Sequence, residues 1–401
     1  MIPVQVVGLG GGPQDLTPRQ AGIVAEAQVL AGGKRLLAMF PDHRARRLAL
    51  AYNLDAWVED LAQAARDRRV AVLASGDPGF FGIAGRLVER LGPEAVVIHP
   101  NLTTVQAAFA RLKEPWQDVA VVSLHGRGDA ALWPALLRAE RVAIYTDSRH
   151  TPEGIARLLL ERGQDHWRLA VLENLGSSTE RVKEYSLEEA AGMSFSPLNL
   201  AVLKRQAWPE ELRLGLGEES FAHQDGLITK SEVRALSLAK LELTPGLTLW
   251  DLGAGSGSLG LEASLLTRGG HVVAVEAVPE RVHQIKANRR RFGAASLEVV
   301  QARLPEALAS LPDPQRVFVG GGGPDLAAII RGAAQRLPSG GILVAALVLV
   351  SSLEAARRAL AAAGLREEIT QVQISRGAAL GDDTYLKAQN PVWLVKGVKR
   401  Q

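Results

Sequence analysis

Short apolar runs alternate with amphipathic stretches along the whole chain. Apolar runs of strand length are typical of strands buried on both faces, and apolar residues at helical spacing between them indicate helices. In the first half we expect strands at residues 4–9, 70–74, 95–98, 119–123, 142–145, 169–172 and 198–203. Strands that alternate with helices form a parallel sheet, and ligands bind at the carboxyl ends of its strands. The pattern predicts an α/β fold.

The second half repeats this alternation. We expect strands at residues 247–252, 271–277, 297–300, 317–319 and 342–350, with the last strands around 374–377 and 390–395. Capping residues mark helix starts in both halves: Thr17 precedes Pro18, and Thr229 stands three residues before Glu232. A second Rossmann-like α/β domain is therefore expected.

The chain is too long for one core, so more than one domain is expected. Periodicity is lost over residues 206–221, which contain four Glu, two Gly and one Pro, and this segment is expected to be a linker. The predicted domains are residues 1–205 and 222–401. A weaker break near Lys113–Trp116 divides the first domain into subdomains of about 1–113 and 114–205.

A glycine-rich turn follows the first strand of the second domain, at Gly253, Ala254, Gly255, Ser256 and Gly257. Glycines allow positive φ and let a ligand lie against the main chain, and the next helix offers free amides. The segment also fits the dinucleotide pattern G-x-G-x-x-G, which alone is a weak signal. The turn therefore leaves S-adenosylmethionine (SAM), NAD and no ligand as alternatives.

Two acids favour SAM among these alternatives. Asp251 ends the strand, where a carboxylate would repel a pyrophosphate but suits the ammonium group of a methionine moiety. Glu276 ends the next strand, where an acceptor can bind both ribose hydroxyls.

Two more glycine-rich loops follow strands of the first half, one with Gly10 and Gly12 and one with Gly76 and Asp77. Both fall at carboxyl ends of strands, so they could face one ligand. Asp77 either forms a turn or pairs with a cationic ligand group. Thr103 and Thr104 either cap a helix or contact the ligand.

Composition and charge exclude several classes of protein. The chain has 401 residues and no cysteine, which excludes disulfides, thiolate metal sites and cysteine-dependent cytosine methylation. Lys plus Arg number 46 against 43 for Asp plus Glu, and no basic run is interleaved with aromatics, so nucleic acid is not an expected partner. No apolar run is long enough to span a membrane, and the start lacks signal-peptide features, so we expect a cytoplasmic protein.

Both halves resemble known families. The first half is similar to the tetrapyrrole methylases, through the loop 8–12, Ser75–Pro78 with Phe81–Gly82, 124–127, and 173–176 with Glu180 and Arg181. The second half resembles the decarboxylating precorrin methylases of the class I SAM fold. It matches at Thr229, 232–234, 251–257, 320–323, 376–377 and 390–392. The order of the two halves is that of the two-domain precorrin methyltransferases of the cobalamin pathway.

The resemblance implies a reaction and a set of binding residues. It implies methyl transfer from SAM to C-5 and C-15 of a corrinoid precursor, with loss of carbon dioxide from the acetate on C-12. The first half would methylate C-5, and the second half would methylate C-15 and decarboxylate. The implied SAM-binding residues, together with those named above, include Phe81, Thr229 and, near the adenine, Leu304. The glycines at 320–323 either only turn the chain or leave room for a bulky flat substrate.

Little side-chain chemistry is needed for this reaction, so no catalytic side chain and no metal are expected. Because the substrate carries many carboxylates, Arg127, Lys230 and Arg376 are predicted to bind it. Each of them could instead be a surface charge without a ligand. The resemblance also implies a homo-oligomer. The alternatives are an RNA methyltransferase, an NAD-dependent oxidoreductase and a tetrapyrrole carrier without catalysis.

Overall fold

The computed structural model describes all residues except 52, 127, 225, 227 and 401. It divides into two compact units. The N-terminal unit contains Met1–His125, Arg141–Glu153 and Leu169–Lys204, and the C-terminal unit contains Gly126–Glu140, Gly154–Arg168 and Arg205–Gln401.

The first sheet of the N-terminal unit is parallel throughout, in the order β3-β2-β4-β1-β5. Its strands are β1 Val4–Gly8, β2 Val29–Gly32, β3 Arg46–Ala49, β4 Val70–Ala74 and β5 Val96–His99, and its helices are α1 Pro18–Ala25, α2 Lys34–Ala38, α3 Leu54–Ala64 and α4 Ala84–Leu91. Thr17 caps α1 as predicted, with its side chain accepting from the Gln20 amide. The predicted strands at 4–9, 70–74 and 95–98 are confirmed, whereas the short β2 and β3 were missed.

The second sheet is mixed, in the order β6-β7-β10-β8-β9. Strand β7 is parallel to β6 and antiparallel to β10. The strands are β6 Ala120–Ser123, β7 Arg141–Tyr145, β8 Trp167–Glu173, β9 Arg181–Ser186 and β10 Asn199–Arg205. The helices of this part of the chain are α5 Thr104–Leu112, α6 Leu132–Arg138, α7 Pro152–Glu161 and α8 Leu187–Ala191. The expected α/β fold is confirmed, but the expectation of parallel strands is wrong for this sheet, because β10 pairs with β7 in the antiparallel direction.

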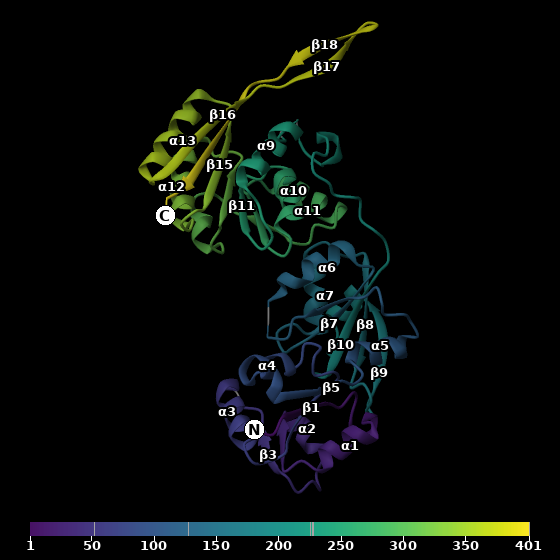
Figure 1. Ribbon diagram of the computed structural model, residues 1–401. Coiled ribbons are helices and arrows are strands. Elements are labelled where there is room, and N and C mark those ends of the chain that lie inside the picture. The colour runs from purple at the N-terminus through teal and green to yellow at the C-terminus, as the bar shows by residue number, and fades with distance from the viewer. Residues whose placement is uncertain (52, 127, 225, 227, 401) are drawn as a thin grey trace. The chain divides into compact units, whose positions relative to one another are not determined.

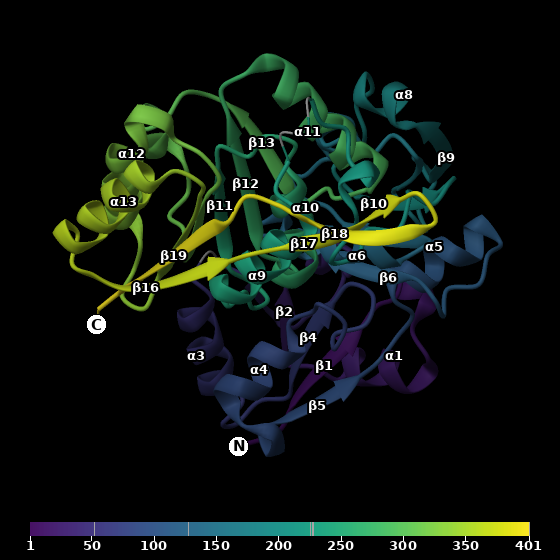
Figure 2. The ribbon, with the colours of Figure 1, turned by 90° about the horizontal axis from the view of Figure 1, so that it is seen from above.

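The C-terminal unit has a seven-stranded sheet in the order β13-β12-β11-β14-β15-β19-β16. Figure 2 shows β11, β12 and β13 side by side in it. Its strands are β11 Thr248–Leu252, β12 His271–Glu276, β13 Leu297–Gln301, β14 Arg316–Val319, β15 Ile342–Leu347, β16 Leu365–Val372 and β19 Val392–Lys399. Strands β11 to β15 pair in parallel, and β19 is antiparallel to both of its neighbours. This confirms the Rossmann-like methyltransferase fold.

Helices cover this sheet and complete two apolar cores. They are α9 Ser231–Leu241, α10 Ser258–Thr267, α11 Pro279–Arg291, α12 Leu326–Arg336 and α13 Val350–Ala362. Leu216 and Phe221, from the segment expected to be a linker, are buried in the core that also contains Leu238 and Phe318. The end of that segment is thus packed onto the C-terminal unit.

A two-stranded hairpin extends from the edge of this unit (Figure 1). It is formed by β17 Ser375–Leu380 and β18 Asp383–Ala388, and Leu380 and Leu386 on it are 66% and 73% exposed. The predicted strand 342–350 is too long, because β15 ends at Leu347 and α13 begins at Val350. Among the described residues, no helix combines the length and apolar character of a membrane span.

Candidate functional site

A cavity of about 800 Å³ lies beside the glycine-rich turn of the C-terminal unit. Gly253, Ala254, Gly255 and Ser256 line it, together with Gly320. The segment before α9 and the base of the hairpin provide further walls, which carry Thr229, Lys230 and Arg376. The structure therefore brings most of the predicted residues of this half to one cavity.

The turn itself depends on glycine. Gly253, Gly255 and Gly257 all have positive φ, at 73°, 57° and 74°. Gly257 does not line the cavity but precedes α10, where a Cβ would lie 2.8 Å from a methyl carbon of Ile285. At Gly253 a Cβ would lie 3.3 Å from the Gly321 amide nitrogen, so the glycine loop after β14 packs closely against the turn. Glycines and two small residues thus form this cavity wall.

Asp251 is buried behind the turn and does not line the cavity. The Gly260 N–H donates to Asp251 Oδ2 at 3.0 Å, which ties the strand end to α10. The pKa of Asp251 is raised to about 7, mainly by burial; the Gly260 hydrogen bond opposes this rise, and the nearby Glu276 adds a smaller one. The structure gives Asp251 a role in holding the turn, and its contact with a ligand ammonium stays a prediction.

Glu276 ends β12 next to the same turn, as predicted. Its Oε2 accepts from the Gly255 amide at 3.0 Å, and its Oε1 accepts from Ala277 and Val278 at 2.9 and 3.0 Å. The carboxylate therefore lies directly against the glycine turn. Leu304 is partly buried against the core and does not line the cavity, so its place near an adenine also stays a prediction.

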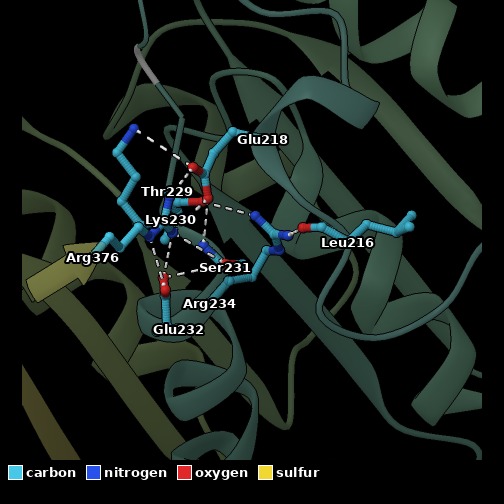
Figure 3. Close-up of polar contacts among 8 residues, drawn as sticks. All are labelled: Leu216, Glu218, Thr229, Lys230, Ser231, Glu232, Arg234 and Arg376. Atoms are coloured by element: carbon cyan, nitrogen blue, oxygen red, sulfur yellow. Dashed lines mark hydrogen bonds and ion pairs between the residues drawn. The ribbon is translucent and has the colours of Figure 1, made fainter. Parts of the chain in front are cut away.

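Arg376 connects the hairpin to the start of α9 (Figure 3). Its Nη1 donates to Glu218 Oε2 at 2.6 Å, its Nη2 to Glu218 Oε1 at 3.1 Å, and its Nε to Glu232 Oε1 at 2.9 Å. Lys230 Nζ lies 3.9 Å from Glu218. Hydrogen bonds from Arg376 lower the pKa of Glu218 to about 2, and Glu218 and Glu232 raise the pKa of Arg376. Arg376 lines the cavity, but two carboxylates already bind it, and its contact with a substrate stays a prediction.

Helix α9 begins near the predicted place but is capped differently. Its N-cap is Lys230, without a side-chain cap, and the Ser231 amide donates to Glu218 Oε1 at 2.8 Å. The predicted cap by Thr229 with Glu232 is therefore wrong. It failed because Glu232 binds Arg376, and a carboxylate from 13 positions upstream satisfies the helix amide instead.

A buried ion pair fixes this segment from behind. Arg234 Nε lies 2.8 Å from Glu262 Oε1, with both side chains fully buried. Arg234 also donates to the carbonyl oxygens of Thr229, at 2.8 Å, and Leu216 (Figure 3). Sequence reasoning assigned Arg234 no such role, because its partners lie on distant segments.

In the N-terminal unit the two glycine loops are hydrogen-bonded to each other. Gly10 and Gly76 form an antiparallel bridge in which the Gly76 amide donates to the Gly10 carbonyl at 3.0 Å. Both have positive φ, and a Cβ at Gly8 would lie 2.6 Å from the Gly76 carbonyl oxygen. Gly12 has an extended φ of 165° and precedes a short 3-10 helix. The expectation that these loops meet at one edge of the sheet is confirmed.

The polar residues near these loops have local hydrogen bonds. Asp77 Oδ1 accepts from the Gly79 amide at 2.7 Å, the geometry of a turn-forming aspartate. Thr103 caps α5, with its hydroxyl accepting from the Gln106 amide at 3.1 Å. Both structural roles considered from the sequence are thus present, and ligand contacts by Asp77 and Thr103 stay predictions.

An aromatic cluster adjoins these loops. Phe81 has φ 53°, unusual for a bulky residue, and its ring centroid lies 5.0 Å from that of Phe80 and 5.8 Å from that of Tyr145. The Tyr145 hydroxyl is hydrogen-bonded to Thr104, and burial raises its pKa. Tyr145 was missed from sequence because a tyrosine that ends an apolar strand reads as core. Arg127, the predicted substrate contact of this half, lies outside the described residues.

Family models match both halves. The model for tetrapyrrole (corrin/porphyrin) methylases matches residues 3–191. The model for the precorrin methyltransferase domain matches residues 219–399.

Relatives match the whole chain or about half of it. A precorrin-6Y C(5,15)-methyltransferase (decarboxylating) of Sinorhizobium is 34% identical over 96% of this chain and 94% of its own. A probable cobalt-precorrin-6B C(15)-methyltransferase (decarboxylating) of Pyrobaculum calidifontis is 42% identical over 45% of this chain and 94% of its own. A cobalt-precorrin-7 C(5)-methyltransferase of Salmonella typhimurium is 39% identical over 44% of this chain and 87% of its own.

Proposed function

Because the chain belongs to the family of decarboxylating precorrin-6Y C(5,15)-methyltransferases, we propose that it methylates C-5 and C-15 of a precorrin and removes carbon dioxide from the acetate on C-12. The observation that carries this is the match to a two-activity relative over 96% of the chain. The glycine-lined cavity of the C-terminal unit and the paired glycine loops of the N-terminal unit supply a candidate methyl-donor site for each activity.

The two activities divide between the halves. The shorter relatives carry the C(15) and C(5) activities in their names, each on a chain that matches less than half of this one. The precorrin methyltransferase model lies on residues 219–399 and the tetrapyrrole methylase model on 3–191. We assign C-15 methylation and decarboxylation to the C-terminal half and C-5 methylation to the N-terminal half.

The residues of the C-terminal cavity fit SAM. When bound, this cofactor supplies an electrophilic methyl group on a sulfonium. Gly253, Ala254, Gly255 and Ser256 offer a main-chain surface without bulky side chains, and Thr229 contributes a hydroxyl on the facing segment. Glu276 lies against Gly255, where its carboxylate can accept from ribose hydroxyls.

In the N-terminal half the proposed SAM site is the edge formed by Gly10, Gly12, Gly76 and Asp77, with Phe81, Thr103 and Thr104 beside it. The Gly10–Gly76 bridge fixes the two loops relative to each other, so their main-chain groups are preorganised. The exposed rings of Phe80 and Phe81 give this edge an apolar face suited to a flat macrocycle.

The chain contributes mainly by orienting the reactants. Methyl transfer would form a carbon–carbon bond from ring electrons while the sulfur–methyl bond of the donor breaks and S-adenosylhomocysteine leaves. Decarboxylation would break the bond to the departing carbon dioxide, with its electron pair taken up by the conjugated ring and a proton from solvent replacing the carboxyl group. Neither step needs a side-chain nucleophile. The protein has to align the reacting atoms and exclude water. Lys230, which lines the cavity, remains a proposed contact for substrate carboxylates.

Several finer points are also proposals. Among the relatives described above the names are those of precorrin methyltransferases, which leaves the RNA methyltransferase alternative without support. We propose a homo-oligomer, supported by the exposed Leu380 and Leu386 of the hairpin, because an isolated two-stranded hairpin is only marginally stable in water. The cytoplasmic location stays a prediction.

Calorimetric titration of the full chain with S-adenosylhomocysteine tests the two proposed SAM sites. We expect two binding events, and no binding of NAD. A single event would remove one of the two sites, and binding of NAD alone would overturn the methyltransferase assignment. Assays with precorrin and cobalt-precorrin substrates in parallel would show which form the enzyme uses.

A further inference from the structure

Four cationic side chains line the cavity of the C-terminal unit: Lys230, Arg281, Arg376 and Lys387. They differ in their surroundings. Glu218 and Glu232 both contact Arg376, and Glu218 also lies near Lys230. Neither Arg281 nor Lys387 has a hydrogen bond or ion pair within the described part of the chain. The cavity thus holds more positive than negative charge, and two of its cations have no carboxylate partner there.

Lys387 lies beside Arg376 on the hairpin, because Arg376 on β17 and Lys387 on β18 are direct partners in the strand register. Residues opposite each other in an antiparallel pair project from the same face, and like charges in such positions repel. Binding of Arg376 by Glu218 and Glu232 offsets that repulsion. Lys387 therefore remains as the exposed charge on this face of the hairpin base.

Arg376 and Lys387 differ in how many existing bonds a substrate carboxylate would have to break. All three guanidinium nitrogens of Arg376 already donate to carboxylates (Figure 3). A substrate carboxylate could bind Arg376 only by breaking charge-assisted hydrogen bonds, which are among the strongest in proteins. Lys387 would break none.

We propose that Lys387 binds a carboxylate of the tetrapyrrole substrate, and that Arg376 is a positioning residue that holds the hairpin base at the cavity. This inference rests on the proposed function, since it concerns the substrate of the C-terminal half. A lysine is suited to this contact because its flexible stem lets one ammonium group follow carboxylates on differently placed side arms.

The same cavity offers a surface for the ring of the substrate. Val348 lines it and is the first of three consecutive exposed apolar residues, with Val348, Leu349 and Val350 at 59%, 61% and 69% exposure. A run of consecutive exposed apolar residues is typical of a binding surface. An apolar wall together with a free ammonium matches a flat macrocycle that carries carboxylates at its rim.

Steady-state kinetics of the full chain with cobalt-precorrin-6B test the role of Lys387. We expect Lys387→Gln to raise the KM for the tetrapyrrole about tenfold, the size expected from losing one charged hydrogen bond. The KM for SAM should change by less than about twofold, and Lys387→Arg should restore most of the affinity. Arg331→Gln, which removes the same charge from α12 away from the cavity, is the matched control and should behave as the wild type.

A double-variant cycle separates the two roles. If Arg376 acts by placing Lys387, Arg376→Gln should raise the KM for the tetrapyrrole, and adding Lys387→Gln should raise it little further. If instead the two substitutions raise the KM for the tetrapyrrole by factors that multiply, Arg376 binds substrate itself and the proposal is overturned.

Further results would contradict the role of Lys387 or the proposed function. A Lys387→Gln chain with the wild-type KM for the tetrapyrrole, or with a raised KM for SAM instead, would contradict the role of Lys387. A wild-type chain that forms no methylated product from either the precorrin or the cobalt-precorrin substrate would refute the proposed function. That result differs from an active wild type with an unaffected Lys387→Gln variant.

Discussion

Arg376 and Glu218 form a two-point ion pair, with Nη1 2.6 Å from Oε2 and Nη2 3.1 Å from Oε1. The two residues are 158 positions apart. Because Glu218 also accepts from the Ser231 amide, this one carboxylate joins the hairpin to the segment that begins α9. Both of these segments line the cavity, so the pair fixes two cavity walls relative to each other.

The first prediction concerns this ion pair. Glu218→Gln should speed amide hydrogen exchange over residues 375–388 by about threefold to tenfold, because a neutral amide binds a guanidinium less strongly and the pair is partly exposed. Mass-spectrometric hydrogen exchange would measure this. Arg357→Gln, at an ion pair with Glu367 on the surface, is the control and should leave exchange in the hairpin unchanged. Equal exchange in Glu218→Gln and wild type would show that the pair does not hold the hairpin.

The second prediction concerns the buried pair of Arg234 and Glu262. Glu262→Leu should lower the free energy of unfolding by roughly 3–5 kcal/mol, because it leaves a buried guanidinium without its counter-charge. Denaturant titration of the full chain would measure it, following the transition of the C-terminal unit. Removing both charges in Arg234→Met/Glu262→Leu should recover part of the loss.

The exposed pair of Arg358 and Glu354 supplies the control for that experiment. Its side chains are 78% and 62% exposed, so Glu354→Leu should have little effect. A loss in Glu262→Leu no larger than in this control would contradict the structural role of the buried pair.

The third prediction concerns pH. Burial raises the pKa of Asp251 to about 7, above its unfolded value of 3.8. Between these values the folded state keeps a proton that the unfolded state has lost, so the contribution of this group to stability falls as pH rises toward 7 and is constant above it. Asp251→Asn should remove this pH-dependent contribution to the free energy of unfolding, because the asparagine side chain can accept from the Gly260 amide without titrating. Unfolding measured from pH 5 to 8 tests it, and an unchanged slope in the variant would refute the assignment.

The fourth prediction concerns assembly. If the hairpin is an interface between copies of the chain, Leu380→Asp with Leu386→Asp should shift the protein to a smaller species, because both side chains are exposed in the single chain. Light scattering during size-exclusion chromatography measures the mass. As the control, Arg331→Asp on α12 makes the same change in net charge and should leave the mass unchanged. A wild-type chain that is monomeric would contradict the proposed oligomer.

The sequence predicted several strands of both units well. Residues 70–74, 271–277 and 297–300 were placed to within about one residue of the observed strands, because buried parallel strands are continuous apolar runs bounded by glycine or polar residues. The meeting of the Gly10 and Gly76 loops followed from the same rule, since parallel strands end at one edge.

The features that were not predicted from the sequence have physical explanations. The run 342–350 is apolar to its end, and composition alone does not show that residues 348–350 leave the sheet and stay exposed. The expected strand around 374–377 corresponds to the start of β17, but β18 was missed, because all of its residues are exposed and it lacks the apolar pattern on which strand prediction depends. The partners of Arg376 could not be foreseen, because long-range ion pairs leave no mark in local sequence.

The most direct test of the central claim is the mass of the product formed by the full chain from its precorrin substrate and SAM. We predict that the wild-type product has gained two methyl groups and lost one carbon dioxide. In a Gly76→Ala chain an alanine has to adopt the positive φ of this position in the N-terminal loop. This chain should yield a product with one new methyl group and the same loss of carbon dioxide. Two new methyl groups from a Gly76→Ala chain of normal fold, or a wild-type product that keeps its carbon dioxide, would contradict the division of the two reactions between the halves.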